Sequence, residues 1–200
     1  MSSTAAYNGL QVTLDAGGSV HGKLTSYPLT SNTATGFFNG DIVRMTSGVL
    51  TPTAATPTTT LGAATPWGIF VGAEWTDASG NPQYTQYFPA AGYTAYSAYG
   101  PITLKIATDP DVRFTVQADG SLTNAAVGLN AQLGNFGAGS TATGNSGVNL
   151  VASSVASTNT FGVKIIAIAP GPDNASGDAY TKVICTWNQN VHALRNILGA

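Results

Sequence analysis

The chain of 200 residues is long enough for one domain with a sizeable core, or for one domain with an arm and an insertion. Only 8% of its residues are charged, against roughly 25% in an average soluble protein, which disfavours long amphipathic helices and favours strands and turns. The net charge is -2 and the seven Lys and Arg residues are isolated from one another, so the sequence argues against a basic patch and against specific nucleic-acid binding.

The first third of the chain combines a polar terminus with strand and turn signals. Residues 1–35 are rich in Ser, Thr, Gly and Asn and are predicted to form an extended N-terminal arm, with one strand-like patch at 10–14. The segment "FFNGDIVRM" (37–45) places a β-branched strand after Asn-Gly, a strong turn signal. Residues 51–66 contain three prolines, which cannot donate to a strand ladder, and are predicted to be loop.

Patterned strands fill the middle of the chain. They are predicted at 67–77, 83–88, 100–107 and 112–118, with a turn at 77–82. In the last of these strands Val112, Phe114 and Val116 alternate with polar residues. Because successive side chains of a strand point to opposite faces, these three are predicted to lie in the core.

The last third of the chain is divided between a polar segment and two strands. Residues 121–160 are nearly uncharged and crowded with Gly, Ser, Thr and Asn, which predicts a loop-rich insertion. Strands are predicted at 161–169 and 179–188, and residues 191–200 are predicted to be a C-terminal tail. Cys185 is the only cysteine, and its apolar neighbours predict a small core residue rather than a nucleophile.

Together these elements predict a mainly β protein, a compact β-barrel or β-sandwich with long excursions. A single β-rich domain would span 36–190, between the arm and the tail, with the insertion inside it. The N-terminus lacks the basic and apolar regions of a signal peptide, and the apolar run at 165–169 is far too short to span a membrane. We therefore expect a soluble protein made in a cytoplasm, and retained there or assembled into something larger.

The stretch "ATDPDVRFTVQADGS" concentrates three carboxylates, Asp109, Asp111 and Asp119, in a chain with few charges. A calcium EF-hand loop that began at Asp109 would place Arg113 at a ligand position, where its charge opposes a cation. A calcium site of another kind, shared by Asp109 and Asp111, stays open. The favoured interpretation is a strand of a β-hairpin, in which the aspartates accept turn hydrogen bonds and Gly120 adopts a positive φ.

Other catalytic patterns are weak. Glu74, the only glutamate, could pair with Asp109 or Asp111 for glycoside hydrolysis, but no sequence signal supports that pairing. No G-x-S-x-G nucleophile elbow occurs, and the two histidines, His21 and His192, lie in the presumed arm and tail. We therefore expect no catalytic, cofactor-binding or metal-binding residues, and a protein that is not an enzyme.

Aromatic residues gather in one segment, "YTQYFPAAGYTAYSAY" (84–99). Aromatic rings with polar tips are enriched at protein interfaces and on sugar-binding platforms. A tyrosine-rich segment with few charges predicts a surface that sits on another protein, although packing on a sheet face would account for the same pattern. Carbohydrate or receptor binding through this segment is the alternative function. The candidate interface residues are Tyr84, Tyr87, Tyr93, Tyr96 and Tyr99.

The order of several segments resembles a known family. "FFNGDIVRM", "WGIFVGAEWTDASGNPQYTQYFPA", "ATDPDVRFTVQADGS", "VGLNAQL…GSTATGNSGVNLVASS" and "PDNASGDAYTKVICTWNQNVHAL" follow one another as in the capsid decoration proteins of tailed bacteriophages, also called cement or head-stabilisation proteins. These include virion proteins of phages that infect cyanobacteria and marine bacteria. The resemblance covers roughly residues 36–192 and rests on the order and spacing of turns.

This resemblance implies a β-rich body on the outside of the major capsid protein lattice, which it reinforces without enzymatic chemistry. The implied partners are the phage major capsid protein and further copies of the chain, with a trimer favoured over a dimer. The implied location is the outer surface of the virion, after assembly in the host bacterial cytoplasm. No cofactor, nucleic acid or membrane is implied, and no individual contact residue is carried over.

Overall fold

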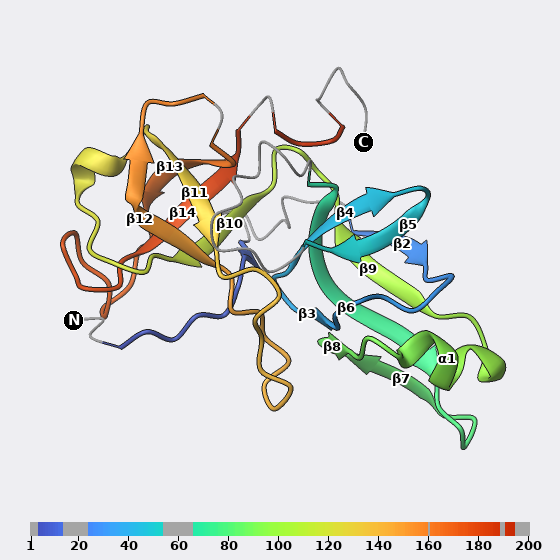
Figure 1. Cartoon of the computed structure of the whole chain (residues 1–200). Helices are drawn as coiled ribbons and strands as arrows, with labels where there is room; N and C mark the ends of the chain where they lie inside the picture. Colours follow the sequence, from blue (N-terminus) through green and yellow to red (C-terminus); the bar gives the residue numbers. More distant parts are fainter. Residues whose placement is uncertain (1–3, 14–23, 54–65, 160, 189–190, 195–200) are drawn as a thin grey trace.

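The computed structural model describes residues 4–13, 24–53, 66–159, 161–188 and 191–194 (Figure 1). Within these ranges the chain is mainly β, and its antiparallel sheets form a sandwich-like body without a closed barrel, which confirms the predicted fold class. The helices of these ranges are short, as expected of a chain with too few charged residues to solvate a long helix face. They are α1 (Gly92–Tyr96) and the 3-10 helices η2 (Ser97–Tyr99) and η3 (Asn124–Ala126).

One sheet has six antiparallel strands and occupies the left half of Figure 1. In spatial order they are β1 (Gln11–Val12), β10 (Arg113–Gln117), β14 (Lys182–Trp187), β13 (Val163–Ile168), β11 (Asn130–Gly134) and β12 (Asn149–Ala156). β10 and β14 pair along five residues, with Phe114 opposite Cys185 and Val116 opposite Val183. These opposed residues all point into the core, since alternate residues of a strand share one face.

A second sheet has five strands in its main path and lies in the right half of Figure 1. In spatial order they are β2 (Leu24–Pro28), β9 (Thr103–Ala107), β6 (Gly68–Thr76), β4 (Ile42–Thr46) and β5 (Val49–Pro52). The second half of the long β6 extends beyond β4 and pairs with β7 (Pro82–Thr85). A two-stranded ribbon of β3 (Phe37–Phe38) and β8 (Tyr87–Phe88) contacts β6.

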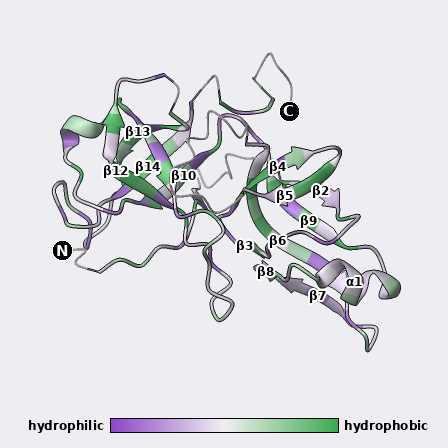
Figure 2. Cartoon of the chain, in the orientation of Figure 1, coloured by the Kyte–Doolittle hydropathy of each residue, from purple (hydrophilic) through white to green (hydrophobic). Residues whose placement is uncertain are grey.

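Two hydrophobic clusters make up the core, one mainly under each large sheet. In the cluster of the six-stranded sheet, the ring centroids of Phe114 and Trp187 lie 5.0 Å apart. The cluster of the five-stranded sheet contains three fully buried phenylalanines, Phe37, Phe70 and Phe88. Figure 2 shows the apolar residues concentrated along the strands of both sheets. The core prediction is confirmed, because the three side chains that it names are at most 1% exposed: Val112, Phe114 and Val116.

The turn from Phe38 to Asp41 connects β3 of the two-stranded ribbon to β4 of the five-stranded sheet. Gly40 in this turn has a φ of 87°, which a glycine adopts without steric penalty, so the turn predicted from Asn-Gly is confirmed. The Gly40 carbonyl accepts a hydrogen bond from the Leu10 N–H at 3.0 Å, and the Asn39 N–H donates to the Gly144 carbonyl at 2.8 Å. Three segments that are distant in the sequence therefore meet at this turn.

The prediction of an extended arm over 1–35 is wrong for the residues that the structure describes there. β1 pairs with β10, and β2 pairs with β9 along its whole length. Leu10 is 0% exposed and Leu29 is 5% exposed. A few apolar residues suffice to dock these short strands, because β10 and β9 each offer an edge with unpaired backbone groups. The β-rich body thus begins before residue 36.

The loop-rich insertion predicted over 121–160 is also partly wrong. β11 and β12 lie in this range and pair with each other, and Ala131, Leu133 and Leu150 are at most 1% exposed. The many small uncharged side chains make the alternation of apolar and polar residues in these strands weak in the sequence. The strands belong to the six-stranded sheet because β11 also pairs with β13. The long loop is confined to 135–148, which projects downward in Figure 1.

The predicted hairpin around 107–121 does not occur. β9 lies in the five-stranded sheet and β10 in the six-stranded sheet, so the turn after β9 carries the chain from one sheet to the other. Gly120 does not have the predicted positive φ. The turn itself is present, since the Val112 N–H donates to the Asp109 carbonyl at 3.1 Å.

The described part of the C-terminal tail, 191–194, packs on the body. Val191 is 3% exposed and His192 is 0% exposed, with the imidazole 5.9 Å from the Trp187 ring. The Ala193 N–H donates to the Pro66 carbonyl at 2.9 Å. These residues therefore belong to the folded body, while His21, the other histidine, lies outside the described residues.

Candidate functional site: the tyrosine platform and an aromatic groove

The five candidate interface tyrosines divide into an exposed pair and a packed trio. Tyr84 on β7 is 56% exposed and Tyr99 on η2 is 48% exposed. Tyr93 and Tyr96 on α1 are half-buried against the cluster of the five-stranded sheet. Tyr87 on β8 is also half-buried, and its ring stacks on a phenylalanine of β3 with 4.8 Å between centroids. The exposed pair thus offers its rings to a partner, while the trio holds α1 and β8 in place.

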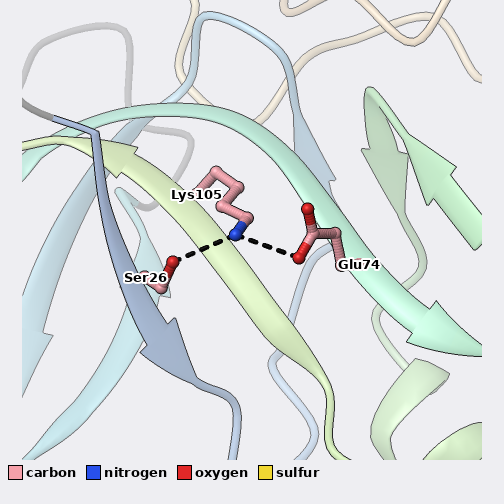
Figure 3. Close-up of polar contacts among 3 residues, drawn as sticks. All are labelled: Ser26, Glu74 and Lys105. Atoms are coloured by element: carbon pink, nitrogen blue, oxygen red, sulfur yellow. Dashed lines mark hydrogen bonds and ion pairs between the residues drawn. The ribbon is translucent and has the colours of Figure 1, made fainter.

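Tyr84 lies over Gly72 on the outer face of the five-stranded sheet. A Cβ at Gly72 would come within 2.7 Å of the Tyr84 hydroxyl, so the glycine makes room for the ring. Next to it, Lys105 Nζ lies 2.9 Å from Glu74 Oε2 and donates a hydrogen bond to Ser26 Oγ at 3.0 Å (Figure 3). These polar side chains come from three neighbouring strands, β2, β9 and β6. We name the five residues Ser26, Gly72, Glu74, Tyr84 and Lys105 the tyrosine platform.

The structure does not bring Glu74 together with the aspartates suggested as its catalytic partners. A glycosidase needs two carboxyl groups within about 10 Å of each other. Glu74 lies opposite Thr103 at the start of β9, whereas Asp109 and Asp111 follow the end of that strand. At about 3.3 Å per residue, the strand alone separates them by about 13 Å. The Glu74 carboxylate instead forms the ion pair of the tyrosine platform.

Asp109 and Asp119 accept backbone hydrogen bonds. Asp109 Oδ1 accepts from the Asp111 N–H at 2.8 Å within the turn after β9. Asp119 Oδ1 accepts from the Ala152 N–H at 2.8 Å and so connects the chain after β10 to the edge strand β12. In the part of the chain that the structure describes, no three His, Cys, Asp or Glu side chains gather closely enough to hold a metal ion.

A groove of about 440 Å³ lies between β8 and the loop residues 141–144. Its aromatic walls are Trp75, Tyr87 and Tyr96. The remaining lining is uncharged: Thr85, Gln86, Pro89, Thr141, Ala142, Thr143 and Gly144. Trp75 follows Glu74 on β6 and therefore points to the opposite face of the sheet, so the groove and the tyrosine platform lie on different faces.

Sequence reasoning identified two of the three rings of this groove but not the groove itself. The loop wall is more than 50 residues from β8 in the chain, and the Asn39 N–H joins them by donating to both the Gln86 carbonyl (2.9 Å) and the Gly144 carbonyl (2.8 Å). Only the aromatic side chains had a signal in the sequence. The long-range backbone contact that completes the site had none.

A larger cavity of about 690 Å³ lies on the outer face of the six-stranded sheet. Arg113 and Lys182 contribute cations to its lining, Asp173 contributes an anion, and Ile184 is among its aliphatic residues. Because its lining carries charges of both signs, this cavity favours no single class of ligand.

Two buried groups have strongly shifted pKa values. Asp41 is 2% exposed, with Oδ1 accepting from Ser146 Oγ at 2.5 Å and Oδ2 accepting from the Phe38 N–H at 2.8 Å. Burial raises the pKa of Asp41 to about 6, although both hydrogen bonds act to lower it. Burial also raises the pKa of the Cys185 thiol, which is 0% exposed, so the prediction of a core cysteine is confirmed.

No protein-family model matches the chain, and no curated protein or solved structure shows significant similarity to it. None of the helices in the described ranges combines the length and the apolar character needed to cross a membrane. The functional interpretation therefore depends on the surfaces described above and on the order of sequence segments.

Proposed function

We propose that this chain is a virion structural protein that binds the outer surface of a phage capsid and stabilises it by bridging subunits of the major capsid protein. The observation that carries the proposal is the exposed pair Tyr84 and Tyr99 at one end of the five-stranded sheet. Tyrosine rings provide a large contact area with few rotatable bonds, and their hydroxyls find polar partners in an interface. The segment order that resembles decoration proteins supports the class of partner.

The strand that carries Tyr84 has an open edge. Among the described strands β7 pairs with β6 alone, so its other edge has backbone groups available to a partner chain. Gly100, which follows Tyr99, packs against Thr76 at the end of β6. The strand that carries Tyr84 and the helical turn that carries Tyr99 therefore lie at the same end of the five-stranded sheet, where Figure 1 shows β7 and α1 at the lower right.

Repetition on a lattice strengthens such a surface. One contact of modest affinity becomes strong when several copies of a symmetric oligomer bind neighbouring coat subunits at once. A ligand that binds only the assembled shell stabilises that shell by linkage. The expected homo-oligomer, a trimer rather than a dimer, can be tested by light scattering on the purified chain.

The test is binding to shells of the parent phage that were assembled without this protein. Co-sedimentation should show the wild-type chain on the shells, and the double variant Tyr84→Ala with Tyr99→Ala should bind at least about tenfold more weakly. Val127→Ala is a matched control, because Val127 is 40% exposed beside η3, in the half of the molecule that holds the six-stranded sheet. Unchanged binding of the double variant, or no binding of the wild-type chain, would contradict the proposal. Deleting 1–35 is unsuitable, because it removes two strands.

A further inference from the structure

The groove beside β8 is walled by three aromatic rings that are held in place by packing. The Trp75 ring lies 5.1 Å from that of Phe88 and 5.6 Å from that of Tyr96, measured between centroids. Tyr87 stacks on the Phe38 ring on its other side. Because these rings are ordered before any ligand arrives, a ligand that stacks on them need not order them.

The groove also offers polar groups without partners. Neither the Gln86 side-chain amide nor the hydroxyls of Tyr87 and Tyr96 form a hydrogen bond with any residue that the structure describes. Thr141 and Thr143 of the loop add further hydroxyls to the lining, whereas the Thr85 hydroxyl of β7 already donates to the Tyr87 carbonyl. Donors and acceptors thus surround the rings, as in small-molecule sites that fix a ligand by a few polar contacts.

No ionisable side chain of the Asp, Glu, Lys, Arg or His type lines the groove. A phosphate, a carboxylate or an ammonium group would find no countercharge there, and burying it would be costly. The ligand that fits is uncharged, has many hydroxyl groups, and has an apolar face that can lie on an aromatic ring. Sugar rings combine these three properties.

We propose that this groove binds a neutral oligosaccharide, with the sugar rings against Trp75, Tyr87 and Tyr96 and the hydroxyl groups bonded to Gln86 and to the loop threonines. The volume of about 440 Å³ lies in the range of small-ligand sites, which suits a few sugar units rather than a whole polymer. The groove is separate from the tyrosine platform. This chain would thus hold a glycan on one face of the β6–β7 ribbon while the other face is free for a protein partner.

The test uses the purified chain with a glycan array, followed by titration calorimetry with maltotriose, cellotriose and chitotriose. We expect at least one neutral glycan to bind, with a change in tryptophan fluorescence that Trp75→Phe removes. Gln86→Ala should weaken binding roughly tenfold, because it removes the hydrogen bonds that the side-chain amide would form with the sugar hydroxyls. Gln86 is exposed, so this variant tests the groove without disturbing the core. Tyr96→Phe removes only a hydroxyl and provides a second, milder variant.

Tyr84→Ala is the matched control, since Tyr84 lies on the opposite face, and it should leave glycan affinity unchanged. Binding confined to anionic glycans, binding of a proline-rich peptide in place of sugars, or glycan binding that Gln86→Ala and Trp75→Phe leave unchanged would each overturn the inference. Absence of binding by the wild-type chain across the array would overturn it as well. Capsid binding is measured separately, so either proposal can fail while the other holds.

Discussion

Replacing Asp41 with asparagine is expected to remove a pH dependence from the free energy of unfolding. Asp41 is 2% exposed at the turn between β3 and β4, and burial raises its pKa from 3.8 to about 6. Between these pH values the unfolded chain releases the proton and the folded chain keeps it. The contribution of Asp41 to stability is therefore fully present below about pH 4 and is lost as the pH rises to about 6.

The magnitude follows from the pKa difference. The values 6 and 3.8 differ by 2.2, and at about 1.36 kcal/mol per pKa unit this corresponds to about 3 kcal/mol. Asparagine has no charge to bury, and its amide can still donate to Ser146 Oγ while its carbonyl accepts from the Phe38 N–H. The variant should match the wild-type chain near pH 4 and exceed its stability by up to about 3 kcal/mol near pH 7.

Urea denaturation followed by tryptophan fluorescence, at unit intervals from about pH 4 to about pH 7, measures this difference. Asp77→Asn is a control that should show no such pH dependence in this range. The Asn81 N–H, foremost among several donors, lowers the pKa of the exposed Asp77 below its ordinary value of 3.8, so its contribution to stability is lost only at a pH below the measured range. A stability difference between Asp41→Asn and wild type that stays constant over the whole pH range would refute the reasoning.

Three further substitutions test packing and hydrogen bonding by chemical denaturation. Phe114→Ala should lower the free energy of unfolding by about 3–5 kcal/mol, because it empties space beside Trp187 in the core; a cost below about 1 kcal/mol would contradict this burial. Gly72→Ala should cost about 1–3 kcal/mol by displacing the Tyr84 ring, and less in a Tyr84→Ala background; equal costs in both backgrounds would show that the ring does not lie there. Asn174→Ala removes three hydrogen bonds to the Ala169 and Lys182 backbone and should cost about 1–2 kcal/mol; Asn174→Asp should cost at least as much, because its second carboxylate oxygen would face the Ala169 and Lys182 carbonyl oxygens to which the amide donates.

Local patterns in the sequence were sufficient to predict the strands that alternate clearly. β10 forms where Val112, Phe114 and Val116 alternate with polar residues, and the turn at Gly40 forms where Asn-Gly precedes a β-branched strand. Cys185 is buried where its apolar neighbours predict it. In each case the local structure is determined by residues close together in the sequence, or by the burial of one apolar face of a strand. Such features can be predicted from the sequence alone.

Sheet membership could not be predicted, because it depends on contacts between distant segments. β9 and β10 are consecutive strands with a turn between them, which is the pattern of a hairpin, yet they enter different sheets. The strands that complete their pairing are β2 and β1, from a polar segment that resembled an arm. β1 has two residues and β2 has five, so neither strand has a clear hydrophobic pattern of its own. Their positions are set by the edges of β10 and β9, whose backbone groups they pair.

The candidate site shows the same division. The tyrosines of 84–99 were evident as a group, but the sequence did not separate those that pack from those that are exposed. That separation comes from the pleat of β6 and β7, which puts Tyr84 on the outer face with Glu74 and leaves Trp75 on the inner face beside Tyr96. Register across this strand pair therefore assigns Tyr84 to the platform and Trp75 to the groove.

The high glycine content of the segment 135–148 explains both why it was predicted to be a loop-rich insertion and how it forms one wall of the aromatic groove. A segment crowded with small residues predicts a loop without fixed contacts, but a Cβ at Gly139 would come within 2.4 Å of the Phe38 ring. The loop 135–148 can approach β3 this closely only because no side chain intervenes, in the same way that Gly72 admits the Tyr84 ring. The lack of side chains, which predicted a loop-rich insertion, thus allows close packing. That packing, together with the hydrogen bonds of Asn39, holds the loop wall of the aromatic groove against β8.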